Sequence, residues 1–440
     1  MIHDELHLKA PGNWMNDPNG FIFFKGKYHL FYQYFPYGPM WGTMHWGHAV
    51  SGDLVRWEHR DIALFPTKGY DRNGIFSGSA LEKDGKLYLY YSAVRYLEED
   101  AENIHYAPRD RYETSQAVLV SEDGMQFDNW GGKTKIIPVC RRPETADAAH
   151  TRDPKVWEED GVYYMVLGST WKEEVGRAVF YRSADGINWE YVNQLRDRRF
   201  GRILECPDVF RAGEDYIFLG SPMYVGGDEP GYGHHAVCAM AEFDREICGL
   251  KLLSECRYID YGQDLYAAQT NVDEMGRRVM VAWMRMPEAV PAEDRKPWIG
   301  MMCQPRVVEA AEGHIFFRVH PNVNQYFGKE TAEKDRLPQT SCRIRTALSE
   351  GEELEIGGYR IWAEQDAVWT DRSRVFAGRK DHKLVSVTPK LHGRYELDIF
   401  VSPNLIEVFV NEGEYVISNV VYGLDGGLRG KIERMYVAVD

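Results

Sequence analysis

The chain has 440 residues, which is too long for one typical domain and predicts two or three. Apolar residues make up 44% and charged residues 27%, as in a globular protein, and the formal net charge of −15 argues against nucleic acid or an anionic membrane surface as a partner. The N-terminus shows no secretory signal, and no apolar run is long enough for a membrane span. The seven Cys form no CxxC pair. We therefore expect a soluble, cytoplasmic protein with reduced thiols.

Five similar runs follow one another along the chain. Each is a turn glycine followed by a strand rich in aromatic and β-branched residues, and they begin at Gly26, Gly85, Gly161, Gly213 and Gly276. Repeats of about 60 residues in a chain with few helical patterns fit four-stranded propeller blades. The sequence therefore predicts an all-β protein with a five-bladed β-propeller. Coincidental hairpins in a β-sandwich are the alternative.

Two further features lie within the repeats. An Asp turn shortly precedes a Trp at residues 51–57, 121–130 and 183–189, which predicts hairpins whose Trp packs between sheets. Residues 95–113 interrupt the second repeat with a charged stretch. We expect this stretch to be a solvated surface loop, and the alternative is that it overhangs a central pocket.

The last part of the chain changes character. After a charged stretch at 329–334, alternating strands follow at 395–401, 406–410 and 415–422, which indicate a small antiparallel sandwich. We therefore predict a propeller domain at residues 1–325 and a C-terminal β-sandwich domain at 326–440.

Carboxylates recur at matched positions of the repeats. Asp17 lies nine residues before its turn glycine, and Asp153 and Glu205 each lie eight before theirs. Ser77 takes this place in the second repeat, and Asp264 lies twelve residues before the glycine of the fifth. Equivalent positions on the innermost strands of a propeller surround one axis, so three or four acids should converge.

Clustered carboxylates have two common uses, a divalent cation site and glycoside hydrolysis. Trp and Phe residues flank the candidate positions and favour a sugar, although the residues alone leave a metal open. Asp17 and Asp153 each precede a Pro, a pattern that points to special backbone at these acids. His45, His48 and His150 lack HExxH spacing and are interpreted as pocket or core groups.

At these residues the sequence resembles glycoside hydrolase family 32, the invertases, sucrose-6-phosphate hydrolases, levanases and inulinases. The resemblance covers essentially the whole chain. It rests on the segments 14–20 (WMNDPNG), 31–34 (FYQY), 41–49 (WGTMHWGHA), 76–80 (FSGSA), 152–157 (RDPKVW) and 205–208 (ECPD), with weaker matches at 264–270 and 400–411.

The resemblance implies a five-bladed propeller followed by a sandwich, and a retaining hydrolase that releases fructose from terminal β-fructofuranosides such as sucrose, sucrose 6-phosphate or short fructans. Asp17 resembles the nucleophile, Glu205 the acid/base and Asp153 the carboxylate that holds fructose hydroxyls. The two catalytic carboxyl groups should then lie about 5–5.5 Å apart, and Glu205 should have a raised pKa. The remaining residues that resemble the substrate-binding set are Asn16, Gln33, Trp41, Phe76, Ser77, Arg152 and Tyr266. No metal or other cofactor is implied.

The sequence departs from the family pattern at Leu204, where an aromatic is usual, at Thr151, where Phe often stands, and at residues 402–404, which replace a charged turn.

A fructosyltransferase using the same covalent intermediate is the nearest alternative function. A non-enzymatic carbohydrate-binding propeller and a related arabinoside- or xyloside-cleaving family are more distant ones. The leaving group stays open: Arg202 or residues 95–111 could bind a phosphate, or could simply be solvated.

Overall fold

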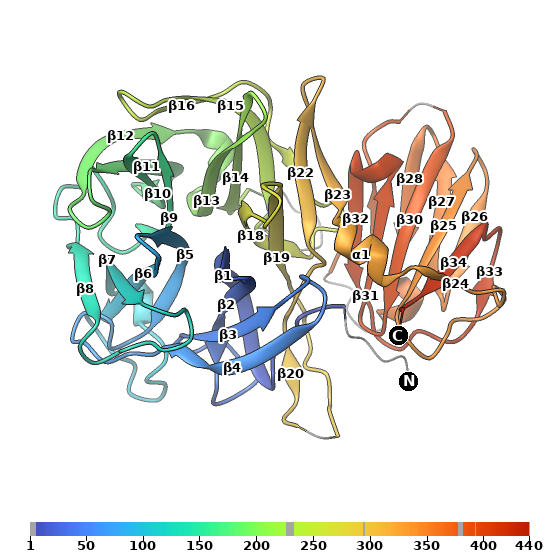
Figure 1. Cartoon of the computed structure of the whole chain (residues 1–440), viewed down its shortest axis with the longest axis horizontal. Helices are drawn as coiled ribbons and strands as arrows, with labels where there is room; N and C mark the ends of the chain where they lie inside the picture. The colour runs from blue at the N-terminus through green and yellow to red at the C-terminus, as the bar shows by residue number, and fades with distance from the viewer. Residues whose placement is uncertain (1–5, 226–232, 294, 377–381, 392, 440) are drawn as a thin grey trace.

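Seven antiparallel-rich sheets make up the molecule. The computed structural model describes residues 6–225, 233–293, 295–376, 382–391 and 393–439. Five sheets surround a central axis, and two further sheets pack face to face beside them (Figure 1). This is a five-bladed β-propeller followed by a β-sandwich, as the repeats predict.

Each propeller blade has four main strands, which follow one another in the sheet from the axis outward. The first two blades contain β1 (Asn13–Phe24), β2 (Lys27–Phe35), β3 (His45–Ser51) and β4 (Trp57–Leu64), and then β5 (Ile75–Lys83), β6 (Lys86–Tyr96), β7 (Tyr112–Ser121) and β8 (Lys133–Ile137). The third blade contains β9 (Arg152–Glu159), β10 (Val162–Trp171), β11 (Val175–Ser183) and β12 (Glu190–Arg196).

The last two blades carry short additional strands. The fourth contains β13 (Ile203–Ala212), β14 (Asp215–Met223), β15 (Val237–Asp244), β16 (Gly249–Leu252) and β17 (Arg257–Tyr258). The fifth contains β18 (Leu265–Val272), β19 (Arg278–Met284), β21 (Met301–Met302), β22 (Arg306–Ala311) and β23 (His314–Val319). The five runs that begin at turn glycines form β2, β6, β10, β14 and β19, the second strand of every blade.

The ring closes between the first and fifth blades. Strand β20 (Trp298–Ile299), from the connection between β19 and β22, pairs in parallel with β1, so that Asn13 lies opposite Trp298. The innermost strands β1, β5, β9, β13 and β18 each contact the next one around the axis. Side chains on these strands therefore face a common centre.

The Asp turns connect the third and fourth strands of the first three blades. In the first, Ser51 Oγ accepts the N–H of Asp53 and Asp53 Oδ1 accepts the N–H of Arg56, at 3.1 and 2.8 Å. Trp57 and Trp189 pack against the cores, as predicted. Trp130 does not: it is 70% exposed, because Phe127 fills the corresponding space against Phe31.

The sandwich packs a six-stranded sheet against a five-stranded sheet. The first contains β24 (Lys329–Glu330), β25 (Cys342–Leu348), β30 (Tyr395–Ser402), β31 (Leu405–Val410), β32 (Tyr415–Val420) and β34 (Arg434–Val437). The second contains β26 (Glu353–Ile356), β27 (Tyr359–Glu364), β28 (Ala367–Asp371), β29 (Val385–Val387) and β33 (Leu428–Arg429).

The helices described are short. The α-helix α1 (Pro321–Tyr326) leads from the propeller to the sandwich, and four single 3-10 turns lie at Pro108–Asp110, Arg198–Phe200, Ser373–Val375 and Asn411–Gly413. Because α1 spans the predicted boundary between residues 325 and 326, that exact boundary stays a prediction. Within the described ranges, no helix has the length and apolar character that a membrane crossing requires.

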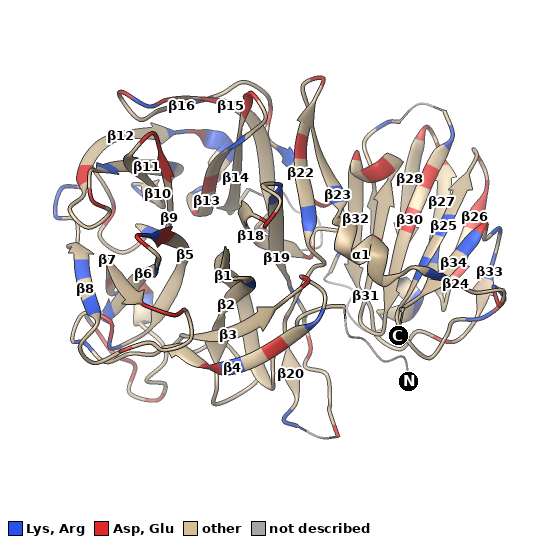
Figure 2. Cartoon of the chain, in the orientation of Figure 1, with Lys and Arg blue, Asp and Glu red and all other residues tan. Residues whose placement is uncertain are grey.

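Buried ion pairs join the two parts of the molecule. The guanidinium of Arg306 on β22 contacts Asp260 at 2.9 Å and Glu407 of the sandwich at 3.0 Å, and all three side chains are fully buried. Acidic and basic residues otherwise alternate over both parts rather than gathering by sign (Figure 2).

Candidate active site

An irregularity interrupts every innermost strand at the same level of the propeller. The pairing register shifts between Met15 and Pro18, Phe76 and Gly78, Arg152 and Lys155, Glu205 and Asp208, and Tyr266 and Gln269. Such bulges leave residues without ladder partners and redirect their side chains. They therefore turn Asp17, Ser77, Asp153 and their neighbours toward the axis.

The local sequence explains why these positions can bulge. Pro154 and Pro207 have no N–H to donate, so they fit where the ladder is interrupted. Asp153, Cys206 and Ala267 have positive φ angles of 63°, 45° and 53°. Side chains other than glycine rarely adopt this backbone, and it concentrates at functional sites.

A cavity of about 390 Å³ opens at this level, and all ten predicted site residues line it. They are Asn16, Asp17, Gln33, Trp41, Phe76, Ser77, Arg152, Asp153, Glu205 and Tyr266. The cavity is also lined by Trp14, Tyr96, Tyr106, Ala107, Asp110, Tyr112 and Trp283. The expectation that acids from several blades converge holds for three of them.

Asp264 does not join this group. It is 2% exposed and forms an ion pair with Arg372 of the sandwich, while its Oδ2 accepts the N–H of Val420 at 2.8 Å. Asp264 precedes β18, and the level of the bulge in the fifth blade is occupied by Tyr266 instead. The extra residues between Asp264 and its turn glycine account for the difference.

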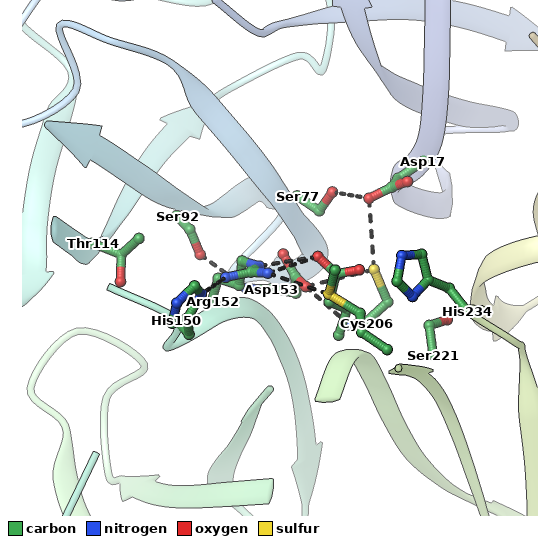
Figure 3. A network of polar contacts seen from close by, with 12 residues as sticks. Asp17, Ser77, Ser92, Thr114, His150, Arg152, Asp153, Cys206, Ser221 and His234 are labelled. Atoms are coloured by element: carbon green, nitrogen blue, oxygen red, sulfur yellow. Dashed lines mark hydrogen bonds and ion pairs between the residues drawn. The ribbon is translucent and has the colours of Figure 1, made fainter. Parts of the chain in front are cut away.

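Hydrogen bonds fix the carboxylate of Asp17. Ser77 Oγ donates to Oδ2 at 2.6 Å (Figure 3), and Asn16 Nδ2 donates to Oδ1 at 3.1 Å. Trp14 Nε1 donates in turn to Asn16 Oδ1 at 2.7 Å. Burial and the charge of Glu205 raise the pKa of Asp17, and the bonds from Ser77 and Asn16 oppose that rise.

Glu205 is held on both oxygens. Arg152 donates through Nε and Nη2 to Oε1, at 3.1 and 2.9 Å, and the hydroxyl of Tyr266 donates to Oε2 at 2.7 Å. Burial alone would raise the pKa of Glu205, but the charge of Arg152 and the bond from Tyr266 outweigh it, so the pKa lies below its ordinary value. The expectation of a raised pKa at Glu205 is therefore wrong for the unliganded site.

Asp153, like Asp17, has a raised pKa. Burial together with the charges of Glu205 and Asp17 raises the pKa of Asp153 to about 7, although Arg152 opposes the rise. Its Oδ2 accepts the N–H of Cys206 at 2.9 Å, and the Cys206 thiol lies 3.6 Å from both Asp153 and Asp17 (Figure 3). At neutral pH Asp153 is therefore partly protonated, while Arg152 and Tyr266 favour the ionised form of Glu205.

An aromatic wall surrounds the mouth of the cavity. Phe76 lies edge-on to Trp41 and Tyr112, with ring centroids 6.1 and 6.5 Å apart. The segment between β6 and β7 supplies Tyr106, Ala107 and Asp110 to this wall. The expectation of a solvated loop at 95–113 is thereby corrected, because these side chains line the cavity.

Only weak signals in the sequence point to the lining residues that were not predicted. Tyr96, Tyr106, Asp110 and Tyr112 lie within or beside the long interruption of the second repeat, whose length was the single indication. Trp283 lies near the end of β19, in the repeated run of the fifth blade.

Leu204, which departs from the family pattern, and Arg202, a candidate phosphate ligand, both lie outside the cavity lining. Leu204 is completely buried among the aromatic rings of the third and fourth blades, Phe200 and Phe218 among them. The guanidinium of Arg202 lies 5.1 Å from the ring centre of Tyr224 and donates to the carbonyl of Glu173. Neither residue contributes to the cavity wall that Asp17 and Glu205 share.

No group of three or more His, Cys, Asp or Glu side chains is arranged to hold a metal ion in the described part of the chain. The converging carboxyls are instead paired with Arg152, hydroxyls and backbone N–H groups. A propeller with three carboxyls on one aromatic-walled cavity defines the class of a glycoside hydrolase.

Comparison with known sequences identifies the family. The profile described as "Glycosyl hydrolases family 32 N-terminal domain" matches residues 7–320, and the profile described as "Glycosyl hydrolases family 32 C terminal" matches residues 331–430. The chain belongs to glycosyl hydrolases family 32. The predicted enzyme class, a glycoside hydrolase of the β-fructofuranosidase family, is confirmed.

Several relatives span nearly the whole chain. A sucrose-6-phosphate hydrolase of Zymomonas mobilis is 35% identical, covering 97% of this chain and 88% of its own length, and a raffinose invertase of Escherichia coli is 31% identical, covering 95% and 89%. The solved family 32 beta-fructofuranosidase of Bombyx mori is 29% identical and superposes with a TM-score of 0.81, covering 99% of this chain and 93% of its own.

Proposed function

We propose that this chain hydrolyses terminal β-fructofuranosides with retention of configuration, through a covalent fructosyl-enzyme intermediate. The observation that supports this most is the convergence of Asp17, Asp153 and Glu205, from three different blades, on one cavity. Relatives named sucrose-6-phosphate hydrolase and raffinose invertase support a sugar with a terminal fructose as the substrate.

Asp17 is the proposed nucleophile. Its carboxylate is oriented by Ser77 and Asn16, so that attack on the anomeric carbon needs little reorganisation. Formation of the ester bond to Asp17 breaks the glycosidic bond, and the leaving oxygen takes a proton from Glu205. Water then loses a proton to Glu205 and attacks the anomeric carbon, which breaks the bond to Asp17 and releases fructose. This geometry requires carboxyl groups about 5–5.5 Å apart, a distance that stays a prediction.

The proton for the leaving oxygen comes from the shared set of carboxyls. In the unliganded site Arg152 favours the ionised form of Glu205, while Asp153 is the more easily protonated group. Moving the proton from Asp153 to Glu205 changes no net charge, so substrate contacts with Asp153 can shift it. Asp153 is then proposed to bind fructose hydroxyls as an anion while Glu205 acts as the acid.

Two substitutions test the roles. Asp17→Asn and Glu205→Gln should each lower kcat for sucrose by several powers of ten with little change in Tm, because each removes one chemical function. Azide should restore turnover of an activated aryl β-fructofuranoside to Glu205→Gln but not to Asp17→Asn. Near wild-type cleavage of sucrose by Asp17→Asn would refute the assignment.

Sucrose, sucrose 6-phosphate and short fructans are the candidate substrates, to be ranked by their kcat/KM values. Transfer of fructose to a second sugar is the alternative reaction, and it would appear as fructo-oligosaccharides at high sucrose concentration.

A reducing, cytoplasmic location is also proposed. The seven cysteines are all free, which supports it.

A further inference from the structure

Building on the proposed fructosidase activity, we infer that the leaving-group side of the cavity selects an uncharged sugar over a phosphorylated one, and that Asp110 is a residue that makes this selection. The segment between β6 and β7 supplies Tyr106, Ala107 and Asp110 to the cavity lining. Three features of the segment lead to the inference: its fixed position, its backbone at Asp110, and the ion pairs that its arginines form with carboxylates of the described residues.

The segment is held firmly against the first and second blades. The hydroxyl of Tyr96 donates to the carbonyl of His105 at 2.9 Å, and Nδ1 of His105 lies 2.7 Å from Oγ1 of Thr43. The His105 ring packs edge-on against Phe35, with centroids 4.8 Å apart. Ala107 of the segment is buried in one cluster with Tyr96 of β6. The segment is therefore a fixed wall of the cavity in the unliganded protein.

The backbone then places Asp110 on the cavity lining. Arg109 and Asp110 have φ angles of 55° and 50°, two consecutive left-handed residues that are not glycine. This conformation costs free energy in residues that carry a side chain, and the contacts of the segment with Tyr96, Thr43 and Phe35 hold it in place. Asp110 accepts no hydrogen bond from the described residues, so its carboxylate is available at the exposed mouth of the cavity.

The cations near the mouth already have partners. Arg109 and Arg111 both contact Glu98, at 3.1 and 3.4 Å, and Arg95 pairs with Glu113. Arg202 lies against Tyr224, outside the cavity lining. None of these four arginines lines the cavity, and Arg95, Arg109 and Arg111 each pair with a glutamate.

The charges that line the cavity are unequal. Asp17, Asp110, Asp153 and Glu205 supply four carboxyls, and among the described lining residues only Arg152 is a cation. Arg152 is already bound to Glu205. A phosphate group of about −1.5 to −2 charges at this mouth would meet like charge and no free cationic donor.

An uncharged sugar fits the same surface. Its hydroxyls can donate to the carboxylate of Asp110, and hydrogen bonds to a charged acceptor are the stronger ones. Trp41 and Tyr106, which are 43% and 49% exposed, offer apolar ring surface to a pyranose. Both contributions are available to glucose, and neither compensates for the charge of a sugar phosphate.

The test compares kcat/KM for sucrose, sucrose 6-phosphate and an aryl β-fructofuranoside in the wild type, Asp110→Asn and Glu102→Gln. Glu102 is exposed on the same segment and does not line the cavity, so its variant controls for the lost charge alone. We expect the wild type to prefer sucrose over its 6-phosphate by about tenfold or more. Asp110→Asn should reduce that preference by about three- to tenfold, and should lower kcat/KM for the aryl fructoside less than for sucrose.

Two results would overturn the inference. One is a wild-type enzyme that prefers sucrose 6-phosphate, and the other is an Asp110→Asn variant with the same preference as Glu102→Gln. Cleavage of the aryl fructoside by the wild type reports separately on the proposed activity. Its absence would refute the fructosidase function, whereas its presence with either of the two results above would refute the selectivity alone.

Discussion

Arg152 donates two hydrogen bonds to a single oxygen of Glu205, from Nε at 3.1 Å and from Nη2 at 2.9 Å, while the hydroxyl of Tyr266 donates to the other oxygen of Glu205. The proposed proton donor is therefore held in its ionised form before substrate binds. This contact determines how the activity should depend on pH.

Replacing Arg152 should move the basic limb of the pH profile. In Arg152→Met, burial would no longer be opposed by a cation, so the pKa of Glu205 should rise and the fall in kcat/KM at high pH should shift upward by about one to two pH units. Arg152→Lys keeps the charge and serves as the control. An unchanged basic limb in Arg152→Met would show that the ion pair does not set the pKa.

The wild-type basic limb should lie near pH 7. The pKa of Asp153 is raised to about 7, and above this pH Asp153 has no proton to pass to Glu205 for the leaving oxygen. Asp153→Asn should move the limb to lower pH, because the remaining proton would have to reside on Glu205, whose pKa is lowered. A wild-type kcat/KM that stays level to pH 9 would contradict this account.

Removing the hydroxyl of Ser77 should shift the acidic limb. The bond from Ser77 lowers the pKa of Asp17, so Ser77→Ala should raise that pKa, move the acidic limb upward and lower kcat about tenfold or more. Ser121→Ala removes a hydroxyl from an Asp turn outside the cavity and should leave the profile in place. Identical acidic limbs in Ser77→Ala and the wild type would argue against this role.

The buried network at Arg306 should dominate the stability of the contact between propeller and sandwich. Arg306→Met leaves Asp260 and Glu407 without their guanidinium, which should lower the free energy of unfolding by about 3–5 kcal/mol. Arg360→Met breaks an ion pair whose partners are 38% and 42% exposed and should cost about 1 kcal/mol or less. Urea unfolding measures both, and equal losses would contradict the prediction.

The sequence by itself determined the all-β class, the five blades and the matched places of Asp17, Asp153 and Glu205. It could do so because strand periodicity and turn residues are local, and because repetition places equivalent residues around one axis. The other seven predicted cavity residues rested on the resemblance to glycoside hydrolase family 32. Asp17, Asp153 and Glu205 were found from their distance to a turn glycine. The same rule failed for Asp264, whose neighbours come from the sandwich.

Only the tertiary structure decided the electrostatics and the shape of the mouth. Whether Glu205 or Asp153 holds the proton depends on where the guanidinium of Arg152 lies and how deeply each carboxyl is buried, and neither quantity is local in sequence. The position of Asp110 depends on contacts that fix an irregular segment against the first blade. Burial and charge contacts arise between residues far apart in the chain, so only the folded arrangement reveals them.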